Sequence, residues 1–267
     1  MTVSALGGRP YVAMAIDVLI ELTPTRWIVT GALLIALSLT RPGEAQENRV
    51  PEAQVESPEW RMTFTPYLWS AALDGSIGLN GEVTDVSLGL GDIIEEFDLG
   101  FVGLFEARRT PWVLRADVLY RNLGQETNGI TVNQDQFILQ PEVGRTVVAQ
   151  PWGSVDLLAG VRYWNLSVDV TAPPNTTSGS KDWVDAMAGA VWRFEPGRRW
   201  HLFVKGDVGG GGAKFSWQGH GGAGYDLGPC CTLSASYRYL DVDYEEADAF
   251  IYDVHFNGPA LGLTLHF

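Results

Sequence analysis

The chain is poor in features that would assign it to several common classes of protein. Lys and Arg number 18 against 32 Asp and Glu, which gives a net charge of −14. Nucleic-acid binding requires clustered cations, so we expect no nucleic-acid partner. His and Cys at metal-ligand spacing are missing, as are a Gly-x-Ser-x-Gly elbow and a phosphate-binding loop after 209–212. We therefore expect neither a metal nor another cofactor.

Cysteine is nearly absent as well. The two cysteines, Cys230 and Cys231, are adjacent and cannot staple distant strands together. Neighbouring residues of a strand point to opposite faces, so we expect two unpaired thiols beside a turn. A strained vicinal disulfide, formed in an oxidising compartment, is the alternative.

The N-terminal region predicts export from the cytoplasm. Arg26 precedes a short apolar run, Trp27 to Leu39, and the small residues Gly43 and Ala45 follow as a cleavage site. This arrangement is typical of a secretory signal peptide, and the run is too short to span a bilayer. We assign 1–45 to the signal peptide, 46–58 to a polar periplasmic lead-in and 59–267 to one all-β domain. An uncleaved membrane anchor is the alternative for the first segment.

The remainder of the chain alternates with the period of β-strands. In the last nine residues apolar side chains alternate with small or polar ones, and the chain ends on Phe267. Similar alternation over 112–121, 182–194, 200–208 and 231–239 puts aliphatic and aromatic residues on one face and charged residues on the other. An apolar exterior around a polar interior explains both faces.

Turn signals divide the alternating runs into strands. Short turns are expected at 110–111, 150–153, 196–198 and 227–229, and longer polar connections near 74–97, 123–133, 169–181 and 245–249, with 209–212 as a compact one among the latter. With a first strand near 60–72 and a last near 251–267, this predicts a closed antiparallel up-and-down barrel of about ten strands, with eight or twelve as alternatives. An even number places both termini on the short-turn side. Two interpretations of 74–97 stay open: a helical turn at 92–97 that plugs the mouth, or two strands over 77–90.

Two segments, 161–168 and 237–244, share an Arg-Tyr pair followed by alternating residues. In both, the apolar face changes parity after the Arg-Tyr pair, and we expect a β-bulge at that point. Proline cannot donate a ladder hydrogen bond, so the triplet 257–259 predicts a break in the last strand.

Together, the signal peptide, Thr-Pro-Tyr-Leu-Trp at 65–69, the segments 160–164 and 237–241 and the terminal phenylalanine resemble small Gram-negative outer-membrane β-barrels of the OmpA-like superfamily, whose members often have eight strands. The resemblance implies contact with outer-membrane lipid and insertion by the barrel-assembly machinery. That machinery would read the C-terminal strand, through Leu263, Leu265 and Phe267. We expect a monomer with both termini in the periplasm.

Charged residues on the inward face form the main candidate site. Six are basic and five acidic: Glu106, Arg108, Arg115, Asp117, Glu142, Arg162, Asp185, Arg193, Lys205, Asp207 and Arg238. One interpretation is a narrow polar pore. The other, which we prefer, is a salt-bridged network that plugs a small barrel, because buried charges must pair.

Acidic residues also gather near the expected loop end. They are Asp169, Asp182, Asp185, Asp241, Asp243, Glu245, Glu246, Asp248 and Asp253. Such a cluster either binds divalent cations or forms a solvated surface, and we prefer the surface. Ten-stranded outer-membrane proteases use carboxylates and a histidine, so His220 and His255 are the candidates for a rim enzyme.

The leading hypothesis is therefore a structural or narrow-pore outer-membrane protein, non-enzymatic, whose loops meet unknown partners. The alternatives are a barrel enzyme acting on peptide or lipid at the rim, and a soluble secreted barrel that binds a ligand.

Overall fold

A computed structural model describes residues 59–79, 82–89, 101–127, 130–173, 175–197, 199–246 and 250–267. The expected signal peptide and lead-in lie outside these ranges. The strands are β1 Arg61–Trp69, β2 Ala72–Leu79, β3 Glu82–Leu88, β4 Phe101–Arg109, β5 Trp112–Thr127, β6 Ile130–Gln150, β7 Gly153–Ala172, β8 Asn175–Phe194, β9 Trp200–Gly211, β10 Phe215–Gly228, β11 Cys231–Glu246 and β12 Phe250–His266. Within these ranges, no helix has the length and apolar character needed to cross a membrane.

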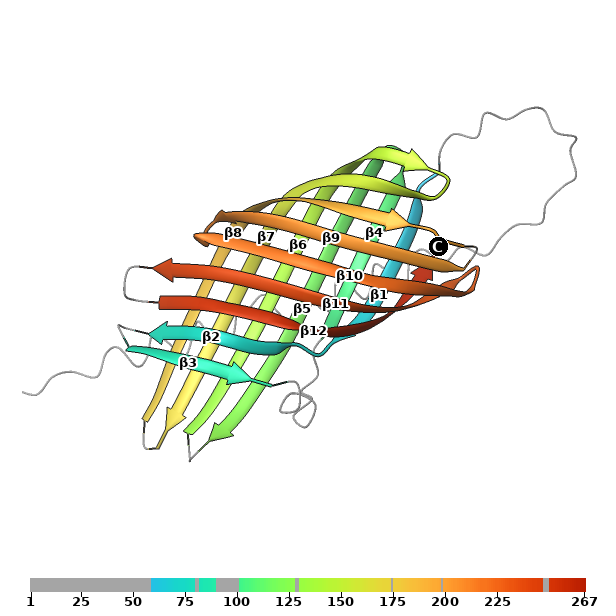
Figure 1. Cartoon of the computed structure of the whole chain (residues 1–267). Coiled ribbons are helices and arrows are strands. Elements are labelled where there is room, and N and C mark those ends of the chain that lie inside the picture. Colours follow the sequence, from blue (N-terminus) through green and yellow to red (C-terminus); the bar gives the residue numbers. More distant parts are fainter. Residues whose placement is uncertain are drawn as a thin grey trace, which may run out of the picture. The chain divides into compact units, whose positions relative to one another are not determined.

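Ten of these strands close into an antiparallel barrel, as the turn pattern predicts (Figure 1). The order is β1-β4-β5-β6-β7-β8-β9-β10-β11-β12, and β12 pairs back onto β1 through pairs such as Phe64 with Leu265. Closure lets each strand find backbone partners on both sides, which is what a spanning sheet needs in hydrocarbon.

The other two strands, β2 and β3, form a hairpin that leaves the ring. β1 and β2 follow one another along β12, with Trp69 opposite Ala260 and Ala72 opposite Asn257. The predicted break at 257–259 is therefore wrong, because β12 stays continuous and its partner is interrupted instead. Gly258 has no side chain, which lets the Ser70 carbonyl approach closely, since a Cβ there would lie 1.8 Å from that oxygen.

The two ends of the barrel differ. One end of the barrel holds Arg61, Phe267, the short turns at 110–111, 151–152 and 229–230, and the described residues 195–197 and 199 that lie between β8 and β9; it is called here the terminal end, and the opposite one the distal end. At the distal end, most of the residues expected as loops near 123–133 and 169–181 are instead strand, because β5 extends to Thr127, β6 starts at Ile130, β7 extends to Ala172 and β8 starts at Asn175. These stretches are rich in Thr and Val, which favour extended backbone. Of the two interpretations of 74–97, the structure has the strands β2 and β3; residues 90–100 lie outside the described ranges.

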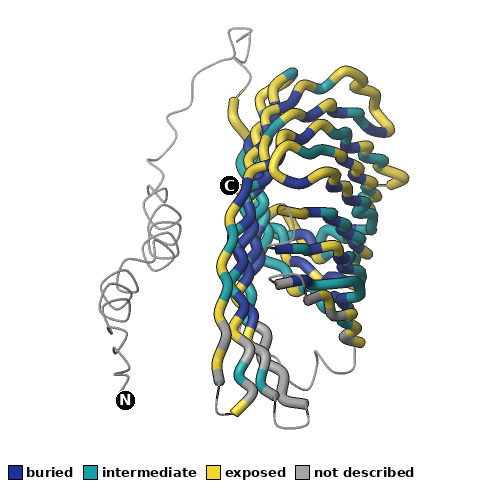
Figure 2. The backbone as a smooth tube through the Cα atoms, turned by 90° about the vertical axis from the view of Figure 1, so that its left-hand side faces the viewer, coloured by how far each residue is buried: buried dark blue, intermediate teal, exposed yellow. Residues whose placement is uncertain are grey.

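In the terminal half of the barrel, the apolar face points outward. Leu233, Val204 and Leu261 are 50%, 53% and 59% exposed, whereas Lys205 and Asp207 are buried inside. The alternation is visible along the strands in Figure 2, where buried and exposed residues follow one another. Outward aromatics gather near the terminal end, among them Trp112, Trp152, Trp200 and Phe267. The structure thus has an apolar belt around a polar interior, as expected.

In the distal half, the two faces exchange character. Arg162, Trp164, Leu166 and Val168 all lie on the inward face of β7 and are buried. The pairing of β7 with β8 runs through this segment without a register shift, and so does that of β11 with β12 beyond Arg238. The predicted β-bulges are therefore wrong. The change that the sequence displays is an inversion of polarity, from an apolar exterior to an apolar interior.

Candidate functional site

The interior holds three layers, of which the middle one is the charge network. All eleven predicted residues lie on inward-facing positions of the barrel strands. The ion pairs are Arg108 with Glu106 and Asp156, Arg115 with Glu106 and Glu142, Arg162 with Asp207, Arg193 with Glu106 and Asp156, Lys205 with Glu142 and Asp207, and Arg238 with Asp117.

Arg162 of β7 occupies the centre of the network and is fully buried. Its Nη2 donates to Asp207 Oδ1 at 2.7 Å, its Nε to Gln140 Oε1 at 3.0 Å, and its Nη1 to Ser216 Oγ at 2.7 Å. A buried charge is tolerated when its attraction to a partner and its hydrogen bonds offset the loss of water. These contacts join β6, β7, β9 and β10 across the lumen, and they hold the Arg162 side chain in one conformation.

A second group of charges lies nearer the terminal end. Glu106 accepts hydrogen bonds from Arg108 at 2.8 Å, from Arg115 at 2.6 Å and from Arg193 at 2.7 Å. Asp156, which the sequence-based set omits, is fully buried and contacts both Arg108 and Arg193. Strict alternation from Arg162 back along β7 would have found it, since even-numbered residues of that strand face inward.

The remaining predicted residues complete the layer in different ways. Lys205 Nζ donates to Glu142 at 2.8 Å, and Arg238 lies 3.0 Å from Asp117, which also accepts a hydrogen bond from Tyr67. Asp185 has no ion pair with a described residue. It accepts hydrogen bonds from the Ala213 amide at 2.7 Å and from the indole of Trp183.

Below the charge network, a vestibule opens toward the terminal end. This cavity has a volume of about 270 Å³ and is lined by hydroxyl groups and by three of the four histidines, His201, His220 and His266. His201 Nε2 lies 2.7 Å from Asp226, which accepts a hydrogen bond from Thr232. Apolar side chains such as Leu202 and Phe203 also line the vestibule, and its lining includes Lys205 and Arg115 of the charge network.

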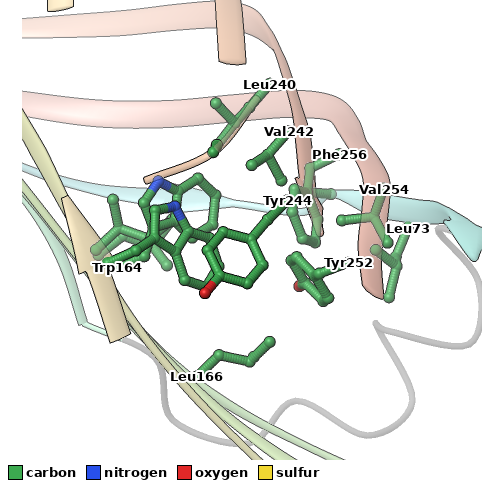
Figure 3. Close-up of a cluster of buried hydrophobic side chains, with 14 of the residues drawn as sticks. Leu73, Trp164, Leu166, Leu240, Val242, Tyr244, Tyr252, Val254 and Phe256 are labelled. Atoms are coloured by element: carbon green, nitrogen blue, oxygen red, sulfur yellow. The ribbon is translucent and has the colours of Figure 1, made fainter. Parts of the chain in front are cut away.

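Above the charge network, the lumen is filled by an aromatic core. Trp164 stacks on Trp183 at 5.3 Å between ring centroids, and Trp183 stacks on Tyr244 at 4.2 Å. Figure 3 shows Trp164 and Leu166 of β7 facing Tyr244 and Tyr252 from the other side of the barrel. Trp164 and Tyr252 are fully buried. These rings close the interior at the level where the polarity of the faces inverts.

The predicted acidic residues do not form one cluster. Asp241, Asp243 and Asp253 lie on the outward side of β11 and β12, whereas Asp185 is buried inside the barrel. Glu246 pairs with Lys181 at 2.5 Å and Glu245 with Lys214, and the latter hydrogen bond raises the pKa of the Lys214 ammonium. Asp169 and Asp182 are exposed, and Asp248 lies outside the described residues. In the part of the chain that the structure describes, no group of three or more His, Cys, Asp or Glu could hold a metal ion.

The two histidines named for a rim enzyme lie on opposite sides of the barrel wall. His220 of β10 lines the vestibule, and its Nε2 lies 3.0 Å from Ser236 Oγ. His255 of β12 stacks on outward-facing Tyr239, with Nε2 3.8 Å from Asp74. The structure therefore does not bring this pair into one site.

Both cysteines are free thiols at the turn between β10 and β11, with their Sγ atoms 2.7 Å apart. Of the residues predicted to signal assembly, Leu263 and Phe267 are exposed on the outward face of the closing strand, with Leu265 between them in sequence and on the same parity. Their role in insertion stays a prediction.

Comparison with known proteins concerns the fold. No family model matches the chain, and no curated protein matches it in sequence. The outer membrane protease OmpT from Escherichia coli superposes with a TM-score of 0.52 at 9% identity, over 79% of this chain and 98% of that one. The translocator domain of the autotransporter NalP from Neisseria meningitidis gives 0.40 at 12% identity, over 91% and 95%. The first likeness supports the barrel fold of Gram-negative outer-membrane proteins, and the second is too loose to carry an argument.

Proposed function

We propose that this chain is a non-conducting outer-membrane barrel, with a structural role, that carries a β-structured head above the membrane. The observation that carries the proposal is the inversion of polarity at Arg162 and Arg238. Below it the exterior is apolar, as hydrocarbon requires, and above it the exterior is mainly polar, with Phe215, Trp217 and Val83 as exposed exceptions, around an apolar interior, as water requires. The OmpT-like fold supports the same location.

The orientation follows from the connections. Both ends of the barrel domain lie at the terminal end with the four short turns. Short turns face the periplasm in bacterial outer-membrane barrels, so we place the terminal end there and the distal end outside the cell. The head then consists of the distal parts of β5 to β8 and of β11, β12, β2 and β3, and its outward Asp74, Asp85, Asp241 and Asp253 offer an acidic surface to partners.

The closed lumen favours the structural role over the narrow pore. Ions need a continuous wet path, and the fully buried Arg162 and Trp164 obstruct that path in two successive layers. Neither residue lines the vestibule. We expect planar bilayers that contain the purified chain to show no current steps at any voltage, with a porin in the same preparation as the positive control. Unitary current steps would overturn the structural role and favour the pore.

Two further measurements separate the other candidates. The chain should stay with the outer-membrane fraction until detergent is added, and its gel mobility should change on boiling, whereas a soluble ligand-binding barrel would need no detergent. A rim enzyme built on the predicted histidines would lose a hydrolytic activity in His220→Ala or His255→Ala. We expect neither substitution to change any hydrolysis that the preparation shows.

A further inference from the structure

Two arginines on the outer wall of the barrel take no part in the charge network. Arg109 is the last residue of β4, Arg145 belongs to β6, and both are exposed at the terminal end. Neither forms an ion pair with another residue in the described part of the chain. Their available partners are therefore anionic groups outside the protein, such as the lipid headgroups at the edge of a bilayer.

Both arginines flank the same tryptophan. Trp112 of β5 lies directly opposite Arg109 on one side and directly opposite Arg145 on the other. Residues in such pairs share a face of the sheet, with Cβ atoms about 4.5–5.5 Å apart. Trp112 is 52% exposed on the outward face. The two arginine side chains therefore project from the outer wall on either side of an exposed indole.

The wall next to this row, toward the distal end, is apolar. The outward positions that follow on β4, β5 and β6 are Ala107, Leu114 and Val143, and after them Phe105, Ala116 and Pro141. Leu157 of β7 lies opposite Arg145 and is exposed as well. This surface has a cationic edge above a carboxylate-free apolar wall, which matches a molecule with an anionic head and hydrocarbon tails.

We propose that Arg109, Trp112 and Arg145 form a binding site for an anionic phospholipid. Each guanidinium group presents a planar fork of N–H donors that matches a phosphate group, and the strands that carry the two arginines are about 10 Å apart, on either side of β5. The indole lies at the level of the headgroup and the acyl chains along the apolar wall.

The charge of the site selects the headgroup. A zwitterionic lipid carries an ammonium group that two neighbouring cations repel, whereas phosphatidylglycerol carries only the phosphate charge. The site rests on the proposed function, because the orientation given there places the terminal end, and with it this row, at the inner leaflet.

Brominated phospholipids test the site, because bromine quenches tryptophan fluorescence on contact. The purified full-length chain is reconstituted into phosphatidylcholine vesicles that contain a minor fraction of brominated phosphatidylglycerol or brominated phosphatidylcholine. We expect phosphatidylglycerol to associate about fivefold more strongly or better, and high salt to reduce this preference. Soluble glycerol phosphate should not displace the lipid, because it lacks the tails. Displacement would indicate a site for free phosphate compounds and overturn the lipid assignment.

Variants with a matched control test the named residues. Arg109→Gln and Arg145→Gln should each lower the preference severalfold, and the double variant should abolish it. The control is Arg199→Gln, which removes an exposed arginine beside Trp200 at the same end, where the guanidinium already donates to the Tyr225 hydroxyl at 3.3 Å. This variant should keep the preference of the wild type. In detergent micelles without phospholipid, none of these substitutions should change urea unfolding.

The outcomes separate this site from the membrane location itself. If brominated phosphatidylcholine does not quench the tryptophans, the chain is not inserted, and both the proposed function and the lipid site are wrong. If it quenches but phosphatidylglycerol associates no more strongly, only the lipid site is wrong. An unchanged preference in the double variant, with folding verified by the boiled-against-unboiled gel shift, would overturn the assignment to these arginines.

Discussion

The terminal and distal halves of this barrel are built from the same strands, but their apolar side chains lie on opposite faces of those strands. In the terminal half of β11, Leu233 faces out and Thr232 faces in, whereas in the distal half Asp241 faces out and Leu240 faces in. The backbone ladder does not change between them. The difference teaches that the environment outside each segment decides which face of a continuous strand is apolar.

The comparison also explains why charges and aromatic rings occupy different layers. Below the inversion, most of the apolar side chains point outward, so polar groups fill the interior. These groups are buried and must pair with one another by hydrogen bonds and ion pairs. Above it, water solvates the exterior, and the inside becomes an ordinary apolar core. Arg162 and Trp164 are two residues apart on β7, and the change from a polar interior to an apolar interior lies between them.

The largest expected effect comes from breaking the charge network at its centre. Arg162→Met removes the closer of the two cations that pair with buried Asp207 and leaves it only Lys205, which is shared with Glu142, so it should cost about 3–5 kcal/mol of unfolding free energy. Urea unfolding in detergent micelles, followed by tryptophan fluorescence, measures the loss. The matched control is Arg145→Met, on the exposed face of β6.

The double variant Arg162→Met with Asp207→Leu sharpens this test. Replacing both members of a buried pair with apolar groups is often far less harmful than removing one. We expect the double variant to recover most of the lost stability. If Arg162→Met unfolds no more easily than Arg145→Met, the charge network does not hold the terminal half together.

A smaller effect should distinguish the apolar interior of the distal half from the apolar exterior of the terminal half. Leu240→Ala, at a fully buried position, should cost about 3 kcal/mol through lost burial and a cavity. Leu233→Ala lies on the same strand but faces outward, where lipid is as apolar as the side chain, so its cost should be well below that. Equal costs in the same unfolding assay would contradict the inversion.

The architecture could be predicted from the sequence because alternation of period 2 survives in every spanning segment. The ten-strand ring, the outward belt and the inward positions of residues such as Lys205 and Asp207 all follow from it. The inversion could not be separated from a bulge on the apolar residues alone, because both move them to the other parity. The polar residues carry the missing signal, since Asn165 and Ser167 take over the outward face while Leu166 stays inward.

Other parts of the site follow less directly from the sequence. Asp156 lies in an alternating strand, yet the short turn beside it obscured its inward position. Arg121 on β5 has the same inward parity as Arg115, but only the assembled sheet shows that it forms no ion pair with a described residue, whereas Arg115 pairs with Glu106 and Glu142. The stretches near 123–133 and 169–181 are rich in polar residues and Gly, Pro or Asn, which predict loops, although strands occupy most of them.

The smallest effect concerns the same chemical pair placed in two environments. Lys205 meets Glu142 inside the lumen, where both side chains are nearly inaccessible, and Lys214 meets Glu245 at the distal rim, where both are exposed. Exposed pairs gain little because water and salt screen them, whereas a buried cation removed from its partner leaves an unpaired carboxylate.

Lys214→Met should therefore leave urea unfolding unchanged, and Lys205→Met should destabilise the barrel strongly. Raising the salt concentration should not alter that ranking, because the buried pair is shielded from solvent ions. Similar losses in the two variants would mean that the rim is as dry as the lumen, which the polar exterior of the head does not allow.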